Sequence, residues 1–264
     1  MKVGTEAYNI DHEQTHARGV LVSESDLHKM LAGPVNKIIN DTQGKSDIRV
    51  LLSSVVNTGF ENAALDSLLQ ESFDVPDWLI GEALAEFLIT EERKCEFPWP
   101  SSRDLKNPNS SATGADLVGF QRTGDPDTPY RFAFGEVKTS TEEKWPPQVV
   151  YGRGGLQEQI EDLKSSQPVK RGLFLYLGHH APNSTWADKY ISAAKRYLKS
   201  NYCDSSLFGV LVRDVEPKSL DLKQRAINSS KEKPAETQIA FFAIYLPLGV
   251  IPNLPDLLAA KAAK

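Results

Sequence analysis

Glu136 and Lys138 form a Glu-x-Lys tripeptide whose charges suit metal-dependent cleavage of a phosphodiester bond. The tripeptide follows the apolar segment 132–135, which is typical of a buried strand. Because side chains alternate along a strand, Glu136 and Lys138 would share one face and Val137 the other. The carboxylate could hold Mg²⁺, while the ammonium group could orient or deprotonate the attacking water or stabilise phosphate charge. A structural Glu–Lys pair at a strand end is the alternative.

The same acid-x-Lys spacing occurs six more times, so the tripeptide alone has little weight. The other occurrences lie at positions 92–94, 104–106, 142–144, 162–164, 216–218 and 221–223. What separates 136–138 from them is the apolar segment before it, because charges at the end of a buried strand are costly unless they are paired or bind a metal.

Asp116 is a second candidate carboxylate, near the start of an apolar segment that we expect to form a strand over residues 115–120. The Gly-, Asp- and Pro-containing residues 124–129 would join it to a strand over residues 131–138 as an irregular hairpin loop. Adjacent antiparallel strands would let Asp116 share a metal ion with Glu136. The alternative for Asp116 is to cap its own turn, and Asp127 in the loop is interpreted as turn chemistry.

Glu82 and Glu86 are candidate carboxylates on a helix that we expect to begin after Pro76, with Asp77 as its cap, and to end near Lys94. The two glutamates are four residues apart and therefore share one helix face. Either of them could reach the metal site, and an ordinary polar helix face is the alternative.

The remaining apolar patterns predict one mixed α/β domain. We expect further helices over residues 62–69, 156–164 and 185–200 and further strands over residues 172–178, 207–212 and 239–246. Residues 77–178 would form the core, residues 1–76 an N-terminal addition and residues 179–264 a C-terminal extension of sheet and helix.

The formal net charge of −5 over 264 residues argues against a protein that coats nucleic acid. Residues 164–233 nevertheless hold 13 Lys and Arg against 6 Asp and Glu, an excess of +7 that leaves −12 for the rest. This excess predicts either a basic face that guides a DNA backbone or a set of solvated helix faces. The candidate residues of such a face are Lys170, Arg171, Lys195, Arg196 and Lys199.

The composition favours a globular cytoplasmic protein. No run of about 18 apolar residues is present, and residues 1–20 lack the apolar middle of a signal peptide, so we expect no membrane partner. The two cysteines, Cys95 and Cys203, match no metal-binding spacing and are expected to be reduced and structural.

The order of elements over residues 77–178 resembles the core of the PD-(D/E)XK nucleases: a helix with Glu, a Gly-x-Asp strand, a Gly-Glu-x-Lys strand, a helix and a strand. This resemblance implies a restriction-endonuclease-like fold, a mixed central sheet flanked by helices, and hydrolysis of DNA with Mg²⁺ or Mn²⁺. The family's metal ligands would fall on Asp116 and Glu136, its water-assisting lysine on Lys138, and its helix glutamate on Glu82 or Glu86.

Some PD-(D/E)XK nucleases also carry a glutamine on the helix after the Glu-x-Lys strand. Gln157 and Gln159 stand on the matching helix and are candidates for DNA contact. The tyrosine that usually follows four residues later is absent, because Glu161 and Leu163 occupy those positions.

Within this superfamily, the segments 80–86 and 134–139 are similar to HamA, the family of nuclease subunits of Hachiman anti-phage defence systems. This narrower resemblance implies a helicase partner and degradation of invading or damaged DNA. The lack of an overall positive charge also indicates that a partner supplies part of the binding to DNA. The alternatives are a restriction endonuclease with its own target recognition and a non-catalytic adaptor that retains the fold.

Other motifs favour structural roles. The glycine-containing segment 152–155 lacks the lysine and hydroxyl of a phosphate-binding loop and is interpreted as a turn. His179 and His180 have no third ligand at metal spacing and are interpreted as a loop pair. No Gly-x-Ser-x-Gly elbow is present, so a serine hydrolase is not indicated.

Overall fold

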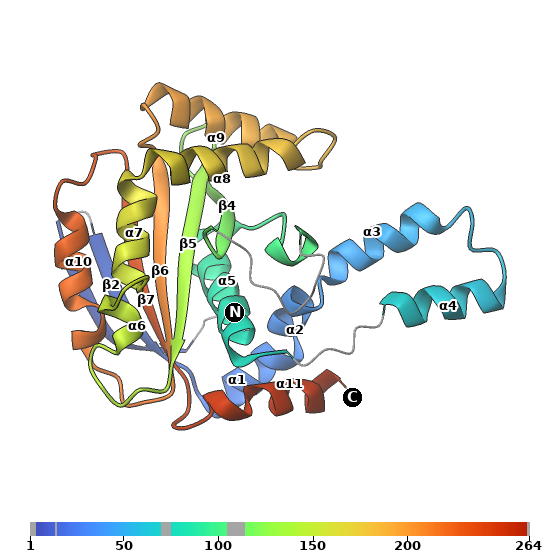
Figure 1. Cartoon of the computed structure of the whole chain (residues 1–264), viewed down its shortest axis with the longest axis horizontal. Coiled ribbons are helices and arrows are strands. Elements are labelled where there is room, and N and C mark those ends of the chain that lie inside the picture. The colour runs from blue at the N-terminus through green and yellow to red at the C-terminus, as the bar shows by residue number, and fades with distance from the viewer. Residues whose placement is uncertain (1–3, 14, 70–74, 105–113, 263–264) are drawn as a thin grey trace.

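The computed structural model describes residues 4–13, 15–69, 75–104 and 114–262 (Figure 1). Its strands form a seven-stranded sheet in the order β1-β2-β7-β6-β5-β4-β3. The strands are β1 (Thr5–His12), β2 (Thr15–Leu21), β3 (Cys95–Glu96), β4 (Leu117–Arg122), β5 (Tyr130–Ser140), β6 (Ser205–Arg213) and β7 (Gln238–Tyr245).

Helices cover both faces of this sheet (Figure 1). They are α1 (Glu24–Ala32), α2 (Pro34–Ile39), α3 (Thr42–Leu52), α4 (Gly59–Leu69), α5 (Asp77–Arg93), α6 (Gln148–Tyr151), α7 (Leu156–Ser165), α8 (Gln167–His180), α9 (Ala187–Lys199), α10 (Lys223–Ser230) and α11 (Leu254–Ala262). Short 3₁₀ turns are η1 (Ser101–Asp104), η2 (Ser219–Asp221) and η3 (Ile251–Asn253). The expected mixed α/β class is confirmed.

Parallel pairing dominates the centre of the sheet and antiparallel pairing its edges. β5, β6, β7 and β2 pair in parallel, whereas β1–β2, β4–β5 and β3–β4 are antiparallel. Parallel neighbours need long crossovers, which α6 to α9 provide between β5 and β6 and α10 provides between β6 and β7. Covered on both faces, β6 is buried along its whole length and reads as an almost unbroken apolar run.

Side-chain alternation divides the core into two layers. Ala133 and Val137 of β5 pack in a cluster with α1, α2, α5 and α11. Phe132 and Phe134 belong to the opposite cluster, which includes residues of α7, α8, α9 and α10. We call these two sides of the sheet the α5 face and the α7 face.

The hairpin prediction is confirmed, since β4 and β5 pair from Leu117↔Gly135 to Arg122↔Tyr130. The helices expected over residues 62–69, 156–164 and 185–200 and the strands expected over 207–212 and 239–246 are present as α4, α7, α9, β6 and β7. The helix expected after Pro76 is also present as α5 and ends at its C-cap, Lys94. Its N-cap is Pro76 rather than Asp77; Asp77 is the first helical residue and accepts from the Trp78 N–H at 2.7 Å.

The strand expected over residues 172–178 is wrong, because this apolar segment lies within α8. Leu173 and Leu177, four residues apart, are buried on one side of the helix, while Arg171 and Leu175 are exposed. The strand that pairs with β5 is instead β6, farther along the chain. His179 and His180 accordingly end a helix and do not lie in a loop.

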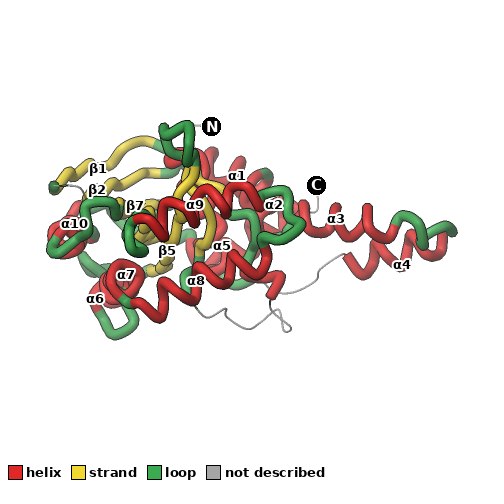
Figure 2. The backbone as a smooth tube through the Cα atoms, turned by 90° about the horizontal axis from the view of Figure 1, so that it is seen from above, coloured by secondary structure: helices red, strands yellow, loops and turns green. Residues whose placement is uncertain are grey.

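Helices α3 and α4 project away from the rest of the protein (Figures 1 and 2). They contribute little to the core, since the buried residues described in them are Gly44 in α3 and Leu65 in α4. Several large apolar side chains are exposed there, including Leu51 at 77%, Phe60 at 84% and Leu68 at 81%. None of the helices in the described ranges combines the length and apolar character needed to cross a bilayer.

Candidate active site

Glu136 and Lys138 lie on the α7 face of β5, as strand alternation predicts. The β5–β6 register runs without a break through Glu136↔Gly209 and Lys138↔Leu211, so both side chains leave the strand on the same side. Lys138 Nζ donates a 2.8 Å hydrogen bond to Glu136 Oε1. The Glu136 side chain is 4% exposed and that of Lys138 is 23% exposed. The lysine is therefore the member of the pair that a solvent-borne substrate can reach more easily.

Asp116 reaches Glu136 across the hairpin. The β4–β5 ladder begins at Leu117↔Gly135, so the Val137 N–H lies beyond the last strand partner on that side. One Asp116 carboxylate oxygen accepts from this N–H at 2.7 Å. The Asp116 carboxyl also forms a hydrogen bond with the Glu136 carboxyl. Two residues that are 20 positions apart in the chain thus form one carboxyl pair.

Burial raises the pKa values of both carboxyls of this pair, and the charge of Asp116 raises that of Glu136 further. For Glu136, burial is the larger cause, followed by the negative charge of Asp116, and the Lys138 ammonium opposes both. For Asp116, burial raises the pKa, while the Val137 N–H, the Lys138 charge and the hydrogen bond with Glu136 lower it. A hydrogen bond between two carboxyls requires a proton on one of them, and a bound cation could take the place of that proton.

Glu82 of α5 belongs to the same electrostatic environment. Burial raises the pKa of Glu82 to about 8, with further contributions from the charges of Asp116 and Glu136, which Lys138 opposes. Since β3 pairs only with Phe120 and Gln121, no described strand covers the outer edge of β4 near Asp116. A carboxyl from the helix on the α5 face can therefore approach the pair at this edge.

Gly81 allows α5 to pack directly on β5 beside Glu82. A Cβ atom at Gly81 would lie 2.2 Å from Thr139 Oγ1, which is far inside van der Waals contact. Thr139 Oγ1 is buried and has no hydrogen-bond partner among the described residues. No sequence pattern pointed to Gly81 or Thr139, because their contact joins two elements that are distant in the chain.

Glu86 faces a different environment, although it lies on the same helix. Burial raises its pKa to about 8, and the other cause is the charge of Asp41, with no contribution from Asp116 or Glu136. Asp41 in turn accepts two 2.7 Å hydrogen bonds from the Arg103 guanidinium. Of the two candidate helix glutamates, the charges that shift the pKa values associate Glu82 with the carboxyl pair.

The carboxyl oxygens of Asp116, Glu136 and Glu82 are the kind of ligand that a hard divalent cation such as Mg²⁺ prefers. Among the described residues, no three His, Cys, Asp or Glu side chains are close enough to enclose a metal ion by themselves. Mg²⁺ does not need such a cage, because proteins commonly hold it with one or two carboxylates while water and phosphate oxygens complete the shell. The Asp116–Glu136 pair supplies those two carboxylates, and Glu82 adds a third carboxyl group to the same electrostatic environment.

The two candidate glutamines point in different directions. Gln157 Nε2 donates to Glu161 at 3.1 Å and to Ser229 of α10 at 3.0 Å, so it faces away from β4. Gln159 lies about 200° further round the helix, on the opposite flank of α7. Its Oε1 atom is buried and lacks a hydrogen-bond partner in the described ranges.

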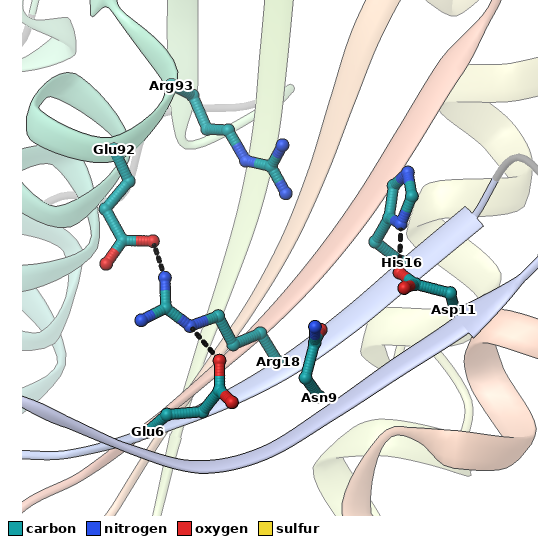
Figure 3. A pocket seen from close by; sticks show the side chains of 7 residues that line it. All are labelled: Glu6, Asn9, Asp11, His16, Arg18, Glu92 and Arg93. Carbon is teal, nitrogen blue, oxygen red and sulfur yellow. Dashed lines mark hydrogen bonds and ion pairs between the residues drawn. The ribbon is translucent and has the colours of Figure 1, made fainter.

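Two adjoining hollows lie at the carboxyl end of α5, away from the carboxyl pair (Figure 3). Their walls come from the β1–β2 hairpin, the end of α5 and the first residues of β6 and β7. None of the lining residues is Glu82, Asp116, Glu136 or Lys138.

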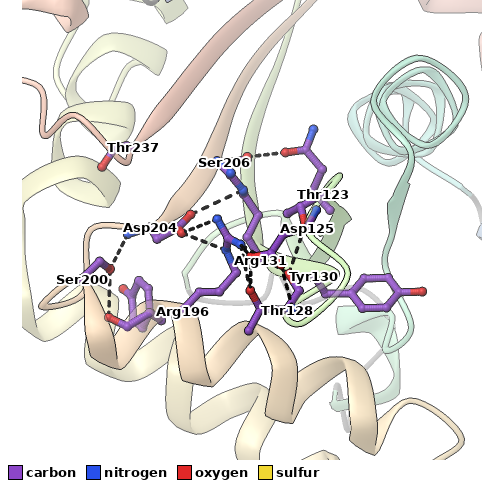
Figure 4. A network of polar contacts seen from close by, with 12 residues as sticks. Thr123, Asp125, Thr128, Tyr130, Arg131, Arg196, Ser200, Asp204, Ser206 and Thr237 are labelled. Atoms are coloured by element: carbon purple, nitrogen blue, oxygen red, sulfur yellow. Dashed lines mark hydrogen bonds and ion pairs between the residues drawn. The ribbon is translucent and has the colours of Figure 1, made fainter.

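The residues of the expected basic face differ in their exposure to solvent and in their ion pairs. Lys170 is buried, whereas Arg171, Lys195 and Lys199 are exposed on α8 and α9. Arg196 binds Asp204 at 2.8 Å and Asp125 at 3.0 Å within the polar network that joins α9 to the β4–β5 loop (Figure 4). Arg171, Lys195 and Lys199 therefore remain available for a phosphate backbone.

The other motifs have structural surroundings. His180 stacks on Trp99 with ring centroids 4.1 Å apart and lies 3.4 Å from an Asp104 oxygen. Residues 152–155 connect α6 to α7, with Gly154 at a φ of 67°. Cys95 and Cys203 are both free, as expected.

Comparison with known proteins adds no family assignment. No protein-family model matches this sequence, and a search of curated proteins finds no significant match.

Proposed function

We propose that this protein is a nuclease that hydrolyses DNA phosphodiester bonds with Mg²⁺ or Mn²⁺. The observation that carries the proposal is the carboxyl pair of half-buried Asp116 and buried Glu136, with Lys138 hydrogen-bonded to Glu136. Holding two acids together in a buried place costs free energy, and strongly raised pKa values of this kind are typical of functional sites. A divalent cation would offset the repulsion.

Each residue of the site has a role in this reaction. Asp116 and Glu136 would hold the ion, with Glu82 as a third carboxylate from α5. An ion bound there supplies Lewis-acid stabilisation of the charge on the scissile phosphate. The Val137 N–H fixes the orientation of Asp116. Lys138 would orient the attacking water and stabilise negative charge that develops on the phosphate oxygens.

The order α5, β4, β5, α7 and β6 supports a restriction-endonuclease-like core for this proposal. In this arrangement the Glu-x-Lys strand lies inside the sheet, between an antiparallel partner that Asp116 immediately precedes and a parallel partner that follows the crossover helices. The carboxyls therefore come from β5, from the residue just before β4 and from the helix that packs on β5. Exposed Arg171, Lys195 and Lys199 would contribute to the DNA contact.

We further propose that the nuclease is the effector of an anti-phage defence complex and acts with a helicase partner. The proposal that the partner is a helicase rests on the sequence resemblance. Two observations support a protein partner in general. With a net charge of −5, the chain has little electrostatic attraction for the DNA backbone. The projecting helices α3 and α4 expose Leu51, Phe60 and Leu68, and such apolar surface is typical of protein interfaces.

A cleavage assay on single-stranded and duplex DNA tests the nuclease, with Mg²⁺ or Mn²⁺ and with and without the helicase partner. We expect Glu136→Ala, Lys138→Ala and Glu82→Gln each to lose activity by roughly 100-fold or more. Glu86→Gln is the matched control, because Glu86 lies on the same helix and its pKa is also raised to about 8. This variant should keep its activity.

Calorimetric titration with Mn²⁺ separates binding of the ion from the chemistry. We expect binding by the wild type and by Lys138→Ala but not by Glu136→Ala. Equal cleavage by wild type and Glu136→Ala would reject this site. A wild type that binds no divalent ion and cleaves no DNA under any of these conditions would favour a non-catalytic adaptor.

A further inference from the structure

A crevice on the α5 face is separate from the proposed nuclease site. It consists of two hollows of about 300 and 460 Å³ that share His16 and Arg93 in their walls. Pockets for small molecules commonly have volumes of about 300–1,000 Å³. Arg93 stands 11 residues after Glu82 on α5, which places the crevice about 16 Å along the helix from Glu82.

Most charged groups around the crevice are already paired (Figure 3). Arg18 binds Glu92 at 2.5 Å and Glu6 at 3.3 Å. His16 Nδ1 lies 2.5 Å from an Asp11 oxygen. These contacts fix the positions of the acidic groups while leaving them open to solvent, since the Glu6 and Asp11 side chains are 52% and 66% exposed.

Arg93 is different from Arg18. Its guanidinium lies over the Phe242 ring at 5.1 Å from the centroid, and no described side chain forms a hydrogen bond or ion pair with it. Figure 3 shows the guanidinium directed into the space between α5 and the sheet. An arginine held in this way presents a planar set of donors that matches a carboxylate in two-point contact.

The surrounding charge selects the kind of anion. Glu6, Asp11, Glu13 and Glu92 line the two hollows against Arg18 and Arg93, which gives a formal charge of −2 with His16 neutral. A phosphate dianion or a nucleic acid backbone would be repelled by this balance. A ligand with one carboxylate and one ammonium group satisfies both parts of the crevice.

We propose that this crevice binds a small zwitterionic ligand, of the size of an amino acid or dipeptide, whose carboxylate pairs with Arg93 and whose ammonium group faces Glu6 and Asp11. Polar groups near the start of the central strands form the wall beside Arg93. Ser206 Oγ lies within hydrogen-bond distance of Gln121 Oε1, and Thr237 Oγ1 donates to the Cys203 carbonyl at 2.7 Å. Their remaining acceptor positions can accept from the peptide N–H of a dipeptide ligand.

Titration of the full chain with glycylglycine, followed by NMR of the arginine side chains and by calorimetry, tests this site. Acetate provides the carboxylate alone, butylamine the ammonium group alone, and inorganic phosphate the competing anion. We expect glycylglycine to bind more tightly than any of these three probes. Removing a two-point charged contact in Arg93→Met should weaken its binding by about tenfold or more.

Two further variants make the result specific. Arg93→Lys keeps the positive charge but loses the two-point contact, so it should bind the dipeptide less tightly than wild type and more tightly than Arg93→Met. Arg171→Met, an exposed arginine on α8, is the matched control and should bind like wild type. The proposal is overturned if wild type does not bind the dipeptide, if phosphate or butylamine binds equally well, or if Arg93→Lys and Arg93→Met bind it unchanged.

Discussion

The contact between Gly81 and Thr139 leads to a sharp prediction about how α5 positions Glu82. In Gly81→Ala, the new Cβ would lie 2.2 Å from Thr139 Oγ1 and 3.5 Å from Thr139 Cβ. Carbon and oxygen atoms do not approach so closely, so the helix must move outward by roughly 1 Å. The threonine does not give way easily, because its pairing with Val212 fixes the backbone in β5 and a β-branched side chain has few favoured rotamers.

Two opposing effects determine the stability of Gly81→Ala. Overpacking of this kind costs about 1–3 kcal/mol. Alanine in place of glycine within a helix recovers up to about 1 kcal/mol. We expect a net loss of about 1 kcal/mol in the free energy of unfolding, measured in urea. If the nuclease proposal holds, a shift of about 1 Å in Glu82 should lower cleavage by up to about 100-fold, which is much more than the loss of stability accounts for.

The double variant Gly81→Ala/Thr139→Ala is the decisive control. Removing Oγ1 leaves Thr139 Cβ as the nearest side-chain atom at an ordinary contact distance of 3.5 Å. Thr139→Ala alone should be close to neutral, because Oγ1 has no hydrogen-bond partner to lose. We therefore expect the second substitution to restore stability and cleavage. A double variant as impaired as Gly81→Ala, or a Gly81→Ala protein identical to wild type, would refute the steric argument.

Three further predictions concern stability and assembly. The pKa of Glu86 rises from 4.5 to about 8 on folding, so the folded state binds more protons and wild-type stability should fall as the pH rises between these values. In urea unfolding, Glu86→Gln should remove that slope and be more stable than wild type by roughly 4 kcal/mol at the upper pH. The side chains of Arg213 and Asp221 are both 0% exposed and form an ion pair in which Arg213 Nη1 lies 2.6 Å from Asp221 Oδ1. Asp221→Asn should therefore cost roughly 3–5 kcal/mol by calorimetry, and a near-neutral result would contradict a buried charge pair. Phe60→Asp in α4 should leave the thermal midpoint unchanged but weaken copurification with a helicase partner; retention of the complex would exclude this surface as its interface.

Local chemistry was sufficient to predict the strand pair and the shared face of Glu136 and Lys138. Alternation along a strand and the turn residues of a short hairpin are properties of a few neighbouring positions, and tertiary packing did not alter them here. The same reasoning failed at residues 172–178, where a continuous apolar run suits either a strand or a helix. Packing settled that segment as part of α8, because it buries Leu173 and Leu177 and leaves Leu175 exposed.

The sequence by itself determined which residue types are available for chemistry: an acid-x-Lys on a buried strand, an aspartate one hairpin away and two glutamates on one helix face. Only the tertiary structure decided which of them meet. Glu82 and Glu86 are chemically identical and four residues apart. The charges of Asp116 and Glu136 nevertheless raise the pKa of Glu82, whereas the charge of Asp41 raises that of Glu86. Electrostatic coupling depends on distance in space, and those neighbours are brought to α5 by strands and helices far away in the chain.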